Sequence, residues 1–342
     1  MSNDVDTMNY FCTFFDIRYL DRGLALYHSL LARGEPFHLW ILCMDRETEE
    51  TLSTQSLRNS TLVTISDLEH ADPRVTIVRQ DRSLVEFYFT SKSFLCQYVF
   101  GMNPDVELLT YFDADGFFFG SPGIILEEMK GYSIGLTGHR FPARLNSMEQ
   151  HGLFNAGFVS FRRDAEGLGA LTWWQDRCIE WCRDYTDCGR YADQGYLNDI
   201  PQRFNRVVII RHKGINAAPW NITQYRVTVA GDRILIDSDP LIFYHFHGVK
   251  KITTSWFDSG LSLYGASLTG SVKKHIYTPY LNELMRTSPL RSESQRSVRI
   301  ERGAYDWFHR LFPSTGKRLQ TMRKIMLGIR YRSLIKYKKP QN

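Results

Sequence analysis

The chain has 342 residues, of which 43% are hydrophobic and 23% are charged, and its formal net charge is +5. This balance is typical of a folded globular protein and excludes wholesale disorder, and the length suits one large domain or two modest ones. No stretch approaches the roughly 20 apolar residues of a membrane-spanning helix. The first eight residues carry acidic and no basic side chains, unlike a secretory signal, so we expect a cytoplasmic protein.

The amino-terminal part of the sequence predicts a β-α-β unit. Residues 8–15 form an apolar and aromatic run, residues 24–31 place apolar side chains at helical intervals, and residues 38–44 form a second apolar run. A strand, a helix and a strand in this order are typical of an α/β fold. The first turn contains Asp16, Arg18 and Tyr19, at a position where nucleotide bases are often bound. An ordinary surface turn is the alternative.

The middle of the chain predicts more of the same sheet. Between residues 49 and 79 we expect a polar helical stretch and a short strand at 75–78, followed by a helix at 86–100. Residues 108–112 are all apolar or aromatic apart from one threonine, as in a central parallel strand. The other predicted elements are helices at 170–185 and 191–200 and strands at 131–137, 157–161, 207–210, 233–236 and 241–246. The fold class is therefore α/β, with a Rossmann-like mixed sheet and flanking helices.

Two carboxylates, Asp113 and Asp115, leave the carboxyl end of the 108–112 strand. Such a pair can hold a hard divalent cation against a diphosphate. The pattern is common, however, and the chain has two further Asp-x-Asp pairs. Asp4 and Asp6 lie in the terminal tail, and the pair at 237–239 fits a turn between two strands. Only Asp113 and Asp115 follow a buried-looking strand, where open α/β sheets bind ligands.

His245 begins a His-x-x-Gly-x-x-Lys pattern that continues with Gly248 and Lys251. A neutral imidazole can complete the coordination of a cation such as Mn²⁺, a glycine lets the backbone approach a phosphate, and a lysine offsets diphosphate charge. Taken alone, a structural histidine is the simpler interpretation. Beside the two carboxylates, a metal ligand is favoured.

Amide and carboxylate side chains gather in two further segments. Asn155 precedes Gly157, and Asp193 and Gln194 are followed by Asn198. Their several donors and acceptors suit sugar hydroxyls. Helix capping by Asp193 is the alternative.

Taken together and in this order, the motifs resemble those of family 8 type retaining glycosyltransferases of the GT-A fold, of the bacterial surface-polysaccharide type. The resemblance covers roughly residues 9–256. It implies a hexosyltransferase that uses a nucleotide-diphosphate sugar, a UDP-sugar, and a glycan or lipid-linked acceptor. It also implies that Asp113, Asp115 and His245 bind Mn²⁺ or Mg²⁺.

The same resemblance implies roles for further residues. Those implied to bind the nucleotide sugar are Thr13, Asp16, Tyr19, Lys92, Asp113, Asn155, Gly248 and Lys251. Asp193 and Gln194 are implied to be catalytic and to face the transferred sugar. The family's lysine is commonly followed by Pro-Trp, whereas Lys251 is followed by Ile252 and Thr253, so Lys250 is an alternative to Lys251.

Competing functions remain open at this point. A sugar nucleotidyltransferase would need a glycine-rich basic loop after the first strand, and residues 14–18 are not one. A phosphatase of the Asp-x-Asp-x-Thr type would need a hydroxyl where Phe117 stands. A non-catalytic nucleotide-sugar-binding module is the remaining alternative.

The last part of the chain is strongly basic. Between Trp307 and Asn342 there are ten basic residues and no acidic residue, so the rest of the chain is mildly acidic. Within it, residues 315–329 place apolar side chains at helical spacing among lysines and arginines. Such a helix suits an anionic membrane surface, although a solvated helix is the alternative; nucleic acid is not expected. We predict a catalytic domain over residues 1–270 and an extension over 271–342 with a linker and this basic helix.

Overall fold

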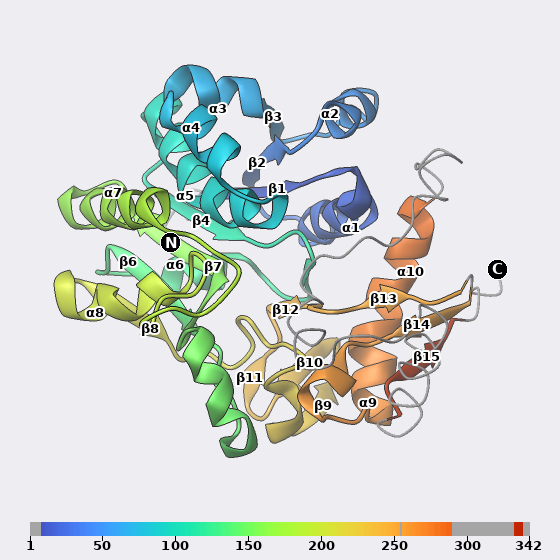
Figure 1. Cartoon of the computed structure of the whole chain (residues 1–342). Coiled ribbons are helices and arrows are strands. Elements are labelled where there is room, and N and C mark those ends of the chain that lie inside the picture. The colour runs from blue at the N-terminus through green and yellow to red at the C-terminus, as the bar shows by residue number, and fades with distance from the viewer. Residues whose placement is uncertain (1–7, 254, 289–331, 338–342) are drawn as a thin grey trace, which may run out of the picture.

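The computed structural model describes residues 8–253, 255–288 and 332–337. Its centre is a seven-stranded mixed sheet with the strand order β3-β2-β1-β4-β7-β6-β8 (Figure 1). The strands are β1 (Asn9–Phe15), β2 (Phe37–Cys43), β3 (Ser60–Thr64), β4 (Leu108–Phe112), β6 (Ile134–Gly138), β7 (Phe154–Arg162) and β8 (Val207–Ile210). Of these, β7 runs antiparallel to both of its neighbours, β4 and β6. The predicted mixed α/β sheet is therefore confirmed.

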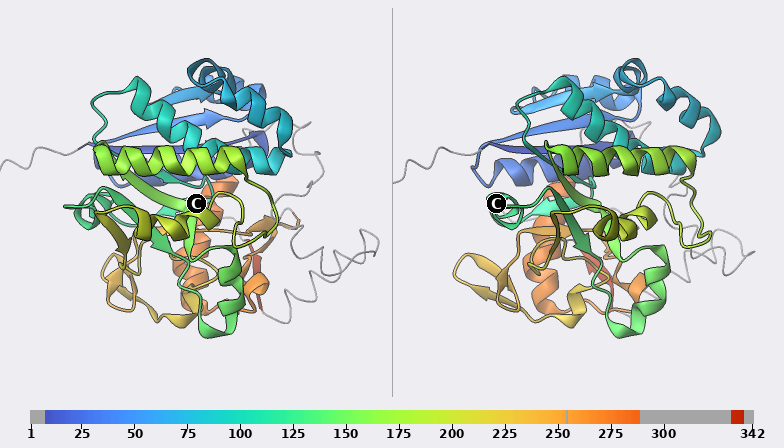
Figure 2. Two further views of the ribbon diagram at one scale, coloured as in Figure 1. Left: turned by 60° about the vertical axis from the view of Figure 1, so that its left-hand side comes forward. Right: turned by 90° about the vertical axis from the view of Figure 1, so that its left-hand side faces the viewer.

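Helices cover both faces of this sheet. On one face a large apolar cluster joins the sheet to α3 (Ile65–Ala71), α4 (Arg74–Asp81), α5 (Leu84–Met102) and α7 (Ala165–Glu180). On the other face a second cluster joins it to α1 (Leu20–Leu31), α2 (Arg46–Ser53) and α6 (Gly123–Glu128). Two views in Figure 2 show α7 crossing the molecule at the level of the sheet. The central strands β1, β2, β4, β6 and β7 are therefore shielded from solvent on both sides, as their apolar runs require.

A smaller half of the molecule, drawn mostly in yellow to red in Figure 1, carries three short sheets, one of which includes the earlier strand β5. Their strands are β5 (Gly116–Phe118) and β12 (Phe243–His245), then β9 (Val227–Ala230), β10 (Arg233–Ile236) and β11 (Asp239–Pro240), then β13 (Lys250–Lys251), β14 (Trp256–Asp258) and β15 (Leu334–Lys336). Short helices here include α9 (Gly270–Val272) and α10 (Thr278–Thr287), and α8 (Ile200–Arg203) lies beside β8. Helix α10 packs with α1 and with Phe246 in one apolar cluster.

The pairing of β5 with β12 decides where the predicted site forms. His245 lies opposite Gly116 in this antiparallel pair, and the backbone N–H of Phe246 donates to the carbonyl of Asp115 at 2.8 Å. Because β5 follows β4 directly, the pairing brings residue 245 to the edge at which β4 ends.

Most predicted elements are confirmed, and one is wrong. Residues 75–78 are not a strand but part of α4, where Val75 and Val78 are both buried on one helical face. The strand that belongs here is β3, which the sequence analysis missed because only Val63 of its five residues is fully buried. The turn predicted at 237–239 is confirmed between β10 and β11.

The predicted basic helix at 315–329 and its linker lie outside the described residues. Within the basic part of the chain, Leu334–Lys336 forms β15 and pairs with β14. The boundary at residue 270 stays a prediction. Among the described helices, not one combines the length and the apolar character that crossing a bilayer demands.

Candidate active site

The three predicted metal ligands lie together at the end of β4. Asp113 and Asp115 flank a tight turn in which the N–H of Gly116 donates to the carbonyl of Asp113 at 3.1 Å. The Nε2 atom of His245 stands 3.0 Å from Oδ1 of Asp115 and 3.9 Å from Oδ2 of Asp113. Two carboxylates and an imidazole from distant parts of the chain thus face one point.

A second imidazole, from His247, joins this group. Ligand atoms of Asp115, His245 and His247 all lie within 4.8 Å of one another. Burial alone would raise the pKa of the Asp115 carboxyl, but His245 and then His247 hold it below its ordinary value. Burial lowers the pKa of His247 to about 4, so its imidazole is neutral at pH 7. A set of mixed oxygen and nitrogen donors suits a transition-type cation such as Mn²⁺.

Gly157 of β7 leaves the space in which these side chains meet. A Cβ atom at this position would lie 2.6 Å from Oδ2 of Asp113, 2.7 Å from Cε1 of His245 and 2.8 Å from Oδ1 of Asn155. All three distances are shorter than van der Waals contact allows. The side chains of Asp113, His245 and Asn155 therefore pack against a backbone position that only glycine leaves open.

Lys92, on α5, links Asp113 to Asp193. Its ammonium lies 3.3 Å from Oδ1 of Asp113 and 3.1 Å from Oδ2 of Asp193, and the Tyr111 hydroxyl donates to Oδ1 of Asp113 at 2.7 Å. Burial would lower the pKa of Lys92, but Asp113 and Asp193 raise it. Burial also raises the pKa of Asp193, more than Lys92 lowers it. This cluster places both carboxylates by charge and hydrogen bonding.

The remaining residues predicted near the transferred sugar are held by the protein itself. The Gln194 amide donates to the carbonyl of His151 at 2.8 Å, and Asn198 accepts from the N–H of Leu153 at 2.9 Å. The indole of Trp174 donates to the backbone carbonyl of Asp193 at 2.8 Å. These bonds fix the 193–198 segment beside the Lys92 cluster.

Asn155 belongs to a buried chain of polar groups. Its Oδ1 accepts from Asn216 at 3.2 Å, and its Nδ2 lies 3.2 Å from Nε2 of His139. Asn216 also donates to the hydroxyl of Thr137 at 2.9 Å. Burial lowers the pKa of His139 to about 3, so this ring is neutral and can accept the Asn155 amide proton. Both ends of the Asn155 amide are thus engaged within the protein.

The first βα turn, where a base-binding site is predicted, is held together by side-chain hydrogen bonds. Asp16 caps η1 (Ile17–Tyr19), and its carboxylate also accepts from Nε of Arg18 at 2.7 Å and from the hydroxyl of Tyr88 at 2.9 Å. The Tyr19 side chain remains 42% exposed, so its ring is available for stacking. Thr13 is buried in β1, and its hydroxyl has no hydrogen-bond partner among the described residues.

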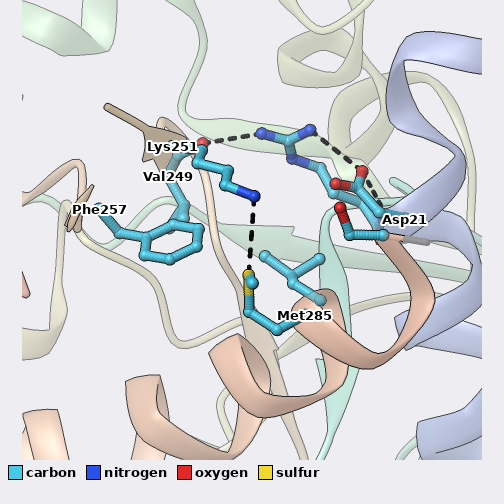
Figure 3. A pocket seen from close by; sticks show the side chains of 8 residues that line it. Asp21, Val249, Lys251, Phe257 and Met285 are labelled. Carbon is cyan, nitrogen blue, oxygen red and sulfur yellow. Dashed lines mark hydrogen bonds and ion pairs between the residues drawn. The ribbon is translucent and has the colours of Figure 1, made fainter. Parts of the chain in front are cut away.

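Gly248 and Lys251 follow the histidines at the rim of the site. Gly248 has a φ of 78°, which favours glycine. Lys251, on β13, lines a small hollow between α1, β14 and α10 (Figure 3), where its ammonium points to the sulfur of Met285 at 3.7 Å. Lys250, the alternative, lies on the same short strand.

An aromatic wall covers the other side of the two histidines. The ring of Trp220 meets His245 edge-on at 5.1 Å between centroids, and it meets His247 at 5.8 Å. Tyr264 lies 5.9 Å from Trp220 and 6.2 Å from His247. These rings shield the imidazoles from water and restrict their orientation.

Sequence reasoning missed His247 and Arg22. His247 could have been found, because it is a second imidazole only two residues after the predicted ligand His245. Arg22 lies one turn after Tyr19 in α1, and its guanidinium stands 4.5 Å from the Tyr19 ring centroid. The sequence shows the spacing of Tyr19 and Arg22, but a charge next to a predicted stacking ring does not by itself indicate a binding residue.

The chain has relatives among known proteins, although no protein-family model matches it. It is 33% identical over 280 residues to the uncharacterized protein YfnD of Bacillus subtilis (strain 168), a match that covers 81% of this chain and 89% of YfnD. It is 32% identical over 253 residues to the uncharacterized protein YfnF of the same bacterium, covering 71% of this chain and 82% of YfnF.

Solved structures share its fold. The galactosyltransferase LgtC, in complex with donor and acceptor sugar analogs, matches with a TM-score of 0.51 and 14% identity, over 87% of this chain and 99% of LgtC. An active-site mutant of LgtC matches with a TM-score of 0.50 and 13% identity, over 84% and 99% of the two chains. These likenesses identify the fold as that of the GT-A glycosyltransferases.

Proposed function

The chain belongs to the family of the Bacillus subtilis proteins YfnD and YfnF, and we propose that it is a metal-dependent glycosyltransferase. It moves a hexose from a nucleotide-diphosphate sugar, a UDP-sugar, to a glycan or lipid-linked acceptor. The observation that carries this proposal is the convergence of Asp113, Asp115 and His245, the three residues that the family resemblance assigns to one ion.

The cation of this proposal is Mn²⁺, with Mg²⁺ as the alternative. Asp115, His245 and His247 would hold it, with Asp113 next to them. Imidazole ligands favour Mn²⁺ over Mg²⁺, which prefers oxygen. When bound, the cation would supply positive charge to the departing diphosphate.

The residues of the chain divide the remaining tasks. Asp16 and Tyr19 hold the base, and Lys251 meets the diphosphate. Lys92 fixes Asp113 and Asp193 relative to each other, which orients Asp193 towards the sugar that is transferred. The Gln194 amide nitrogen donates to the carbonyl of His151. Its amide oxygen is left to face the sugar next to Asp193.

The transfer retains the anomeric configuration in this proposal, which follows the family resemblance. Either a group near Asp193 or Gln194 attacks the sugar first, or the acceptor attacks from the face of the leaving group. The surroundings of Asp193 do not distinguish between the two routes. Its carboxylate is paired with Lys92, and burial raises its pKa.

The acceptor is a lipid-linked glycan or a lipopolysaccharide. The ten basic residues after Trp307 would hold the enzyme on the anionic cytoplasmic face of a membrane, where such acceptors present their sugars. In that case the protein is cytoplasmic and peripheral.

The proposal is tested by nucleotide release. Purified protein is incubated with a panel of nucleotide sugars and Mn²⁺, with and without EDTA, and free nucleoside diphosphate is measured. We expect release from a UDP-sugar that stops with EDTA and falls at least roughly 100-fold in Asp115→Ala. Asp232→Ala, in the exposed turn between β9 and β10, is the matched control and should keep full activity.

Other outcomes point to the alternatives. Binding of UDP and Mn²⁺ without any release would indicate a non-catalytic nucleotide-sugar-binding module. Release of pyrophosphate from a nucleoside triphosphate and a sugar phosphate would indicate a sugar nucleotidyltransferase. Activity that survives in Asp115→Ala would count against the site.

A further inference from the structure

The hollow in Figure 3 brings two cationic side chains together, Arg22 from α1 and Lys251 from β13. Its other walls are largely apolar and include Val249, Phe257 and Met285. The Lys251 ammonium points to a thioether, a weak acceptor. Among the described residues it has no carboxylate within salt-bridge distance. The described residues therefore supply no matching anion for this ammonium.

Several contacts fix the position of Arg22. Its side chain is 17% exposed, and Nη2 donates to the carbonyl of Val249 at 2.9 Å. The distance from Nη1 to Oδ1 of Asp21 is 3.6 Å, which is long for a hydrogen-bonded ion pair. The guanidinium also stands over the ring of Tyr19. The protein thus fixes the position of this charge at the wall of the hollow.

The charge of Arg22 lies between the base-binding turn and the metal ligands. On one side it contacts Tyr19. On the other, it donates to the carbonyl of Val249, two residues after the candidate ligand His247. A diphosphate that connects a base at Tyr19 to an ion at Asp115 would pass this guanidinium.

We propose that Arg22 binds the diphosphate of the nucleotide sugar, as a second cation beside Lys251. This inference rests on the proposed function and adds a residue to it. A guanidinium offers two parallel N–H donors that match two phosphate oxygens. Because Arg22 also donates to Val249, two residues before Lys251, the bond ties α1 to the segment that carries the first cation.

The experiment compares Arg22→Gln with Arg33→Gln by titration calorimetry in the presence of Mn²⁺. Arg33 ends the same helical region and likewise donates to a backbone carbonyl, that of Phe119 at 2.7 Å, so it is a matched control. The probes are UDP, UMP, uridine and inorganic pyrophosphate. We expect Arg22→Gln to weaken UDP and pyrophosphate roughly 10- to 30-fold, UMP less, and uridine less than about twofold. Arg33→Gln should match the wild type for every probe.

The outcomes separate this inference from the proposed function. Unchanged UDP affinity in Arg22→Gln overturns the role of Arg22 and leaves the function standing. An equal loss for uridine also overturns it, because Arg22 would then only support Tyr19. If the wild type binds neither UDP nor pyrophosphate, both the role of Arg22 and the proposed function are overturned. If it binds pyrophosphate through Arg22 but does not bind UDP, the role of Arg22 is supported and a UDP-sugar is excluded as the donor. If Arg22→Gln does not fold, Arg22→Lys is used instead, because it keeps the charge but loses the two parallel N–H donors. A loss of UDP affinity that is larger than the loss of uridine affinity would again support the role of Arg22, and equal or absent losses would overturn it.

Discussion

The two carboxylates of the site have opposite surroundings, although one residue separates them. Asp113 accepts from the hydroxyl of Tyr111 and pairs with Lys92. Asp115 faces His245 and His247 instead. The protein thus neutralises the first carboxylate with its own cation and surrounds the second with potential metal ligands.

The difference follows from the two halves of the fold. The partners of Asp113 come from β4 and α5, elements of the large sheet layer, and they extend to Asp193. The partners of Asp115 come from β12 and the segment after it, which reach the site only through pairing with β5. We infer that the Asp113 side contributes mainly to folding and placement, and that the Asp115 side contributes mainly to ion binding. The predictions below test this division.

The largest effect is expected on stability from Lys92→Met. Without its ammonium, the carboxylates of Asp113 and Asp193 would share a largely buried site uncompensated, which costs roughly 3–5 kcal/mol. Urea unfolding of the variant measures this loss. Lys130→Met, at an exposed position after α6, is the control and should change stability by less than about 0.5 kcal/mol.

The Lys92 prediction has an internal check. Adding Asp193→Asn to Lys92→Met removes one of the two stranded charges and should restore part of the stability. If Lys92→Met unfolds at the same urea concentration as the wild type, the Asp113 side is not a folding element and the division between the two carboxylates fails.

Gly157→Ala tests the space between the two sides. The added methyl would overlap Asp113 and His245, so one of them must move, and a displacement of about 1 Å in a site can cost roughly 100-fold in rate. We expect nucleotide release to fall by about that factor, while the stability loss stays within the roughly 1–3 kcal/mol of overpacking. Gly101→Ala, where a Cβ meets nothing within 4 Å, is the control; full activity in Gly157→Ala would mean that the donors need no such space.

The sequence could predict the framework of this site but not its partners. The strands 9–15, 37–43 and 108–112 followed from their apolar runs, and the Asp113 pair followed from its place after the last of them. The convergence of His245 on this pair was anticipated through the family resemblance. Apolar periodicity contains no information on long-range pairing such as that of β5 with β12, so local patterns alone could not have shown it.

Other features were out of reach for different reasons. In β3 a single residue is fully buried, so no apolar pattern marks the strand. The bonds that engage Asn155 with Asn216 and His139 depend on strand β7, the residue after β6 and the segment after β8 meeting in space, and such contacts are not encoded in spacing. Lys92 was implied by resemblance, but its double pairing with Asp113 and Asp193 became visible only when α5 was placed over the sheet.

His247→Ala tests the Asp115 side and carries the smallest expected effect of the three. Loss of one ligand from the set formed with Asp115 and His245 should weaken Mn²⁺ binding roughly 10- to 100-fold, which is measured by electron paramagnetic resonance of free Mn²⁺ during titration. Because the neutral imidazole compensates no buried charge, stability without metal should change little, in contrast to Lys92→Met. His70→Ala, at an exposed position of α3, is the control. Unchanged Mn²⁺ affinity in His247→Ala would mean that Asp113, not His247, is the third ligand. Both carboxylates would then bind the ion, and the proposed division between them would fail.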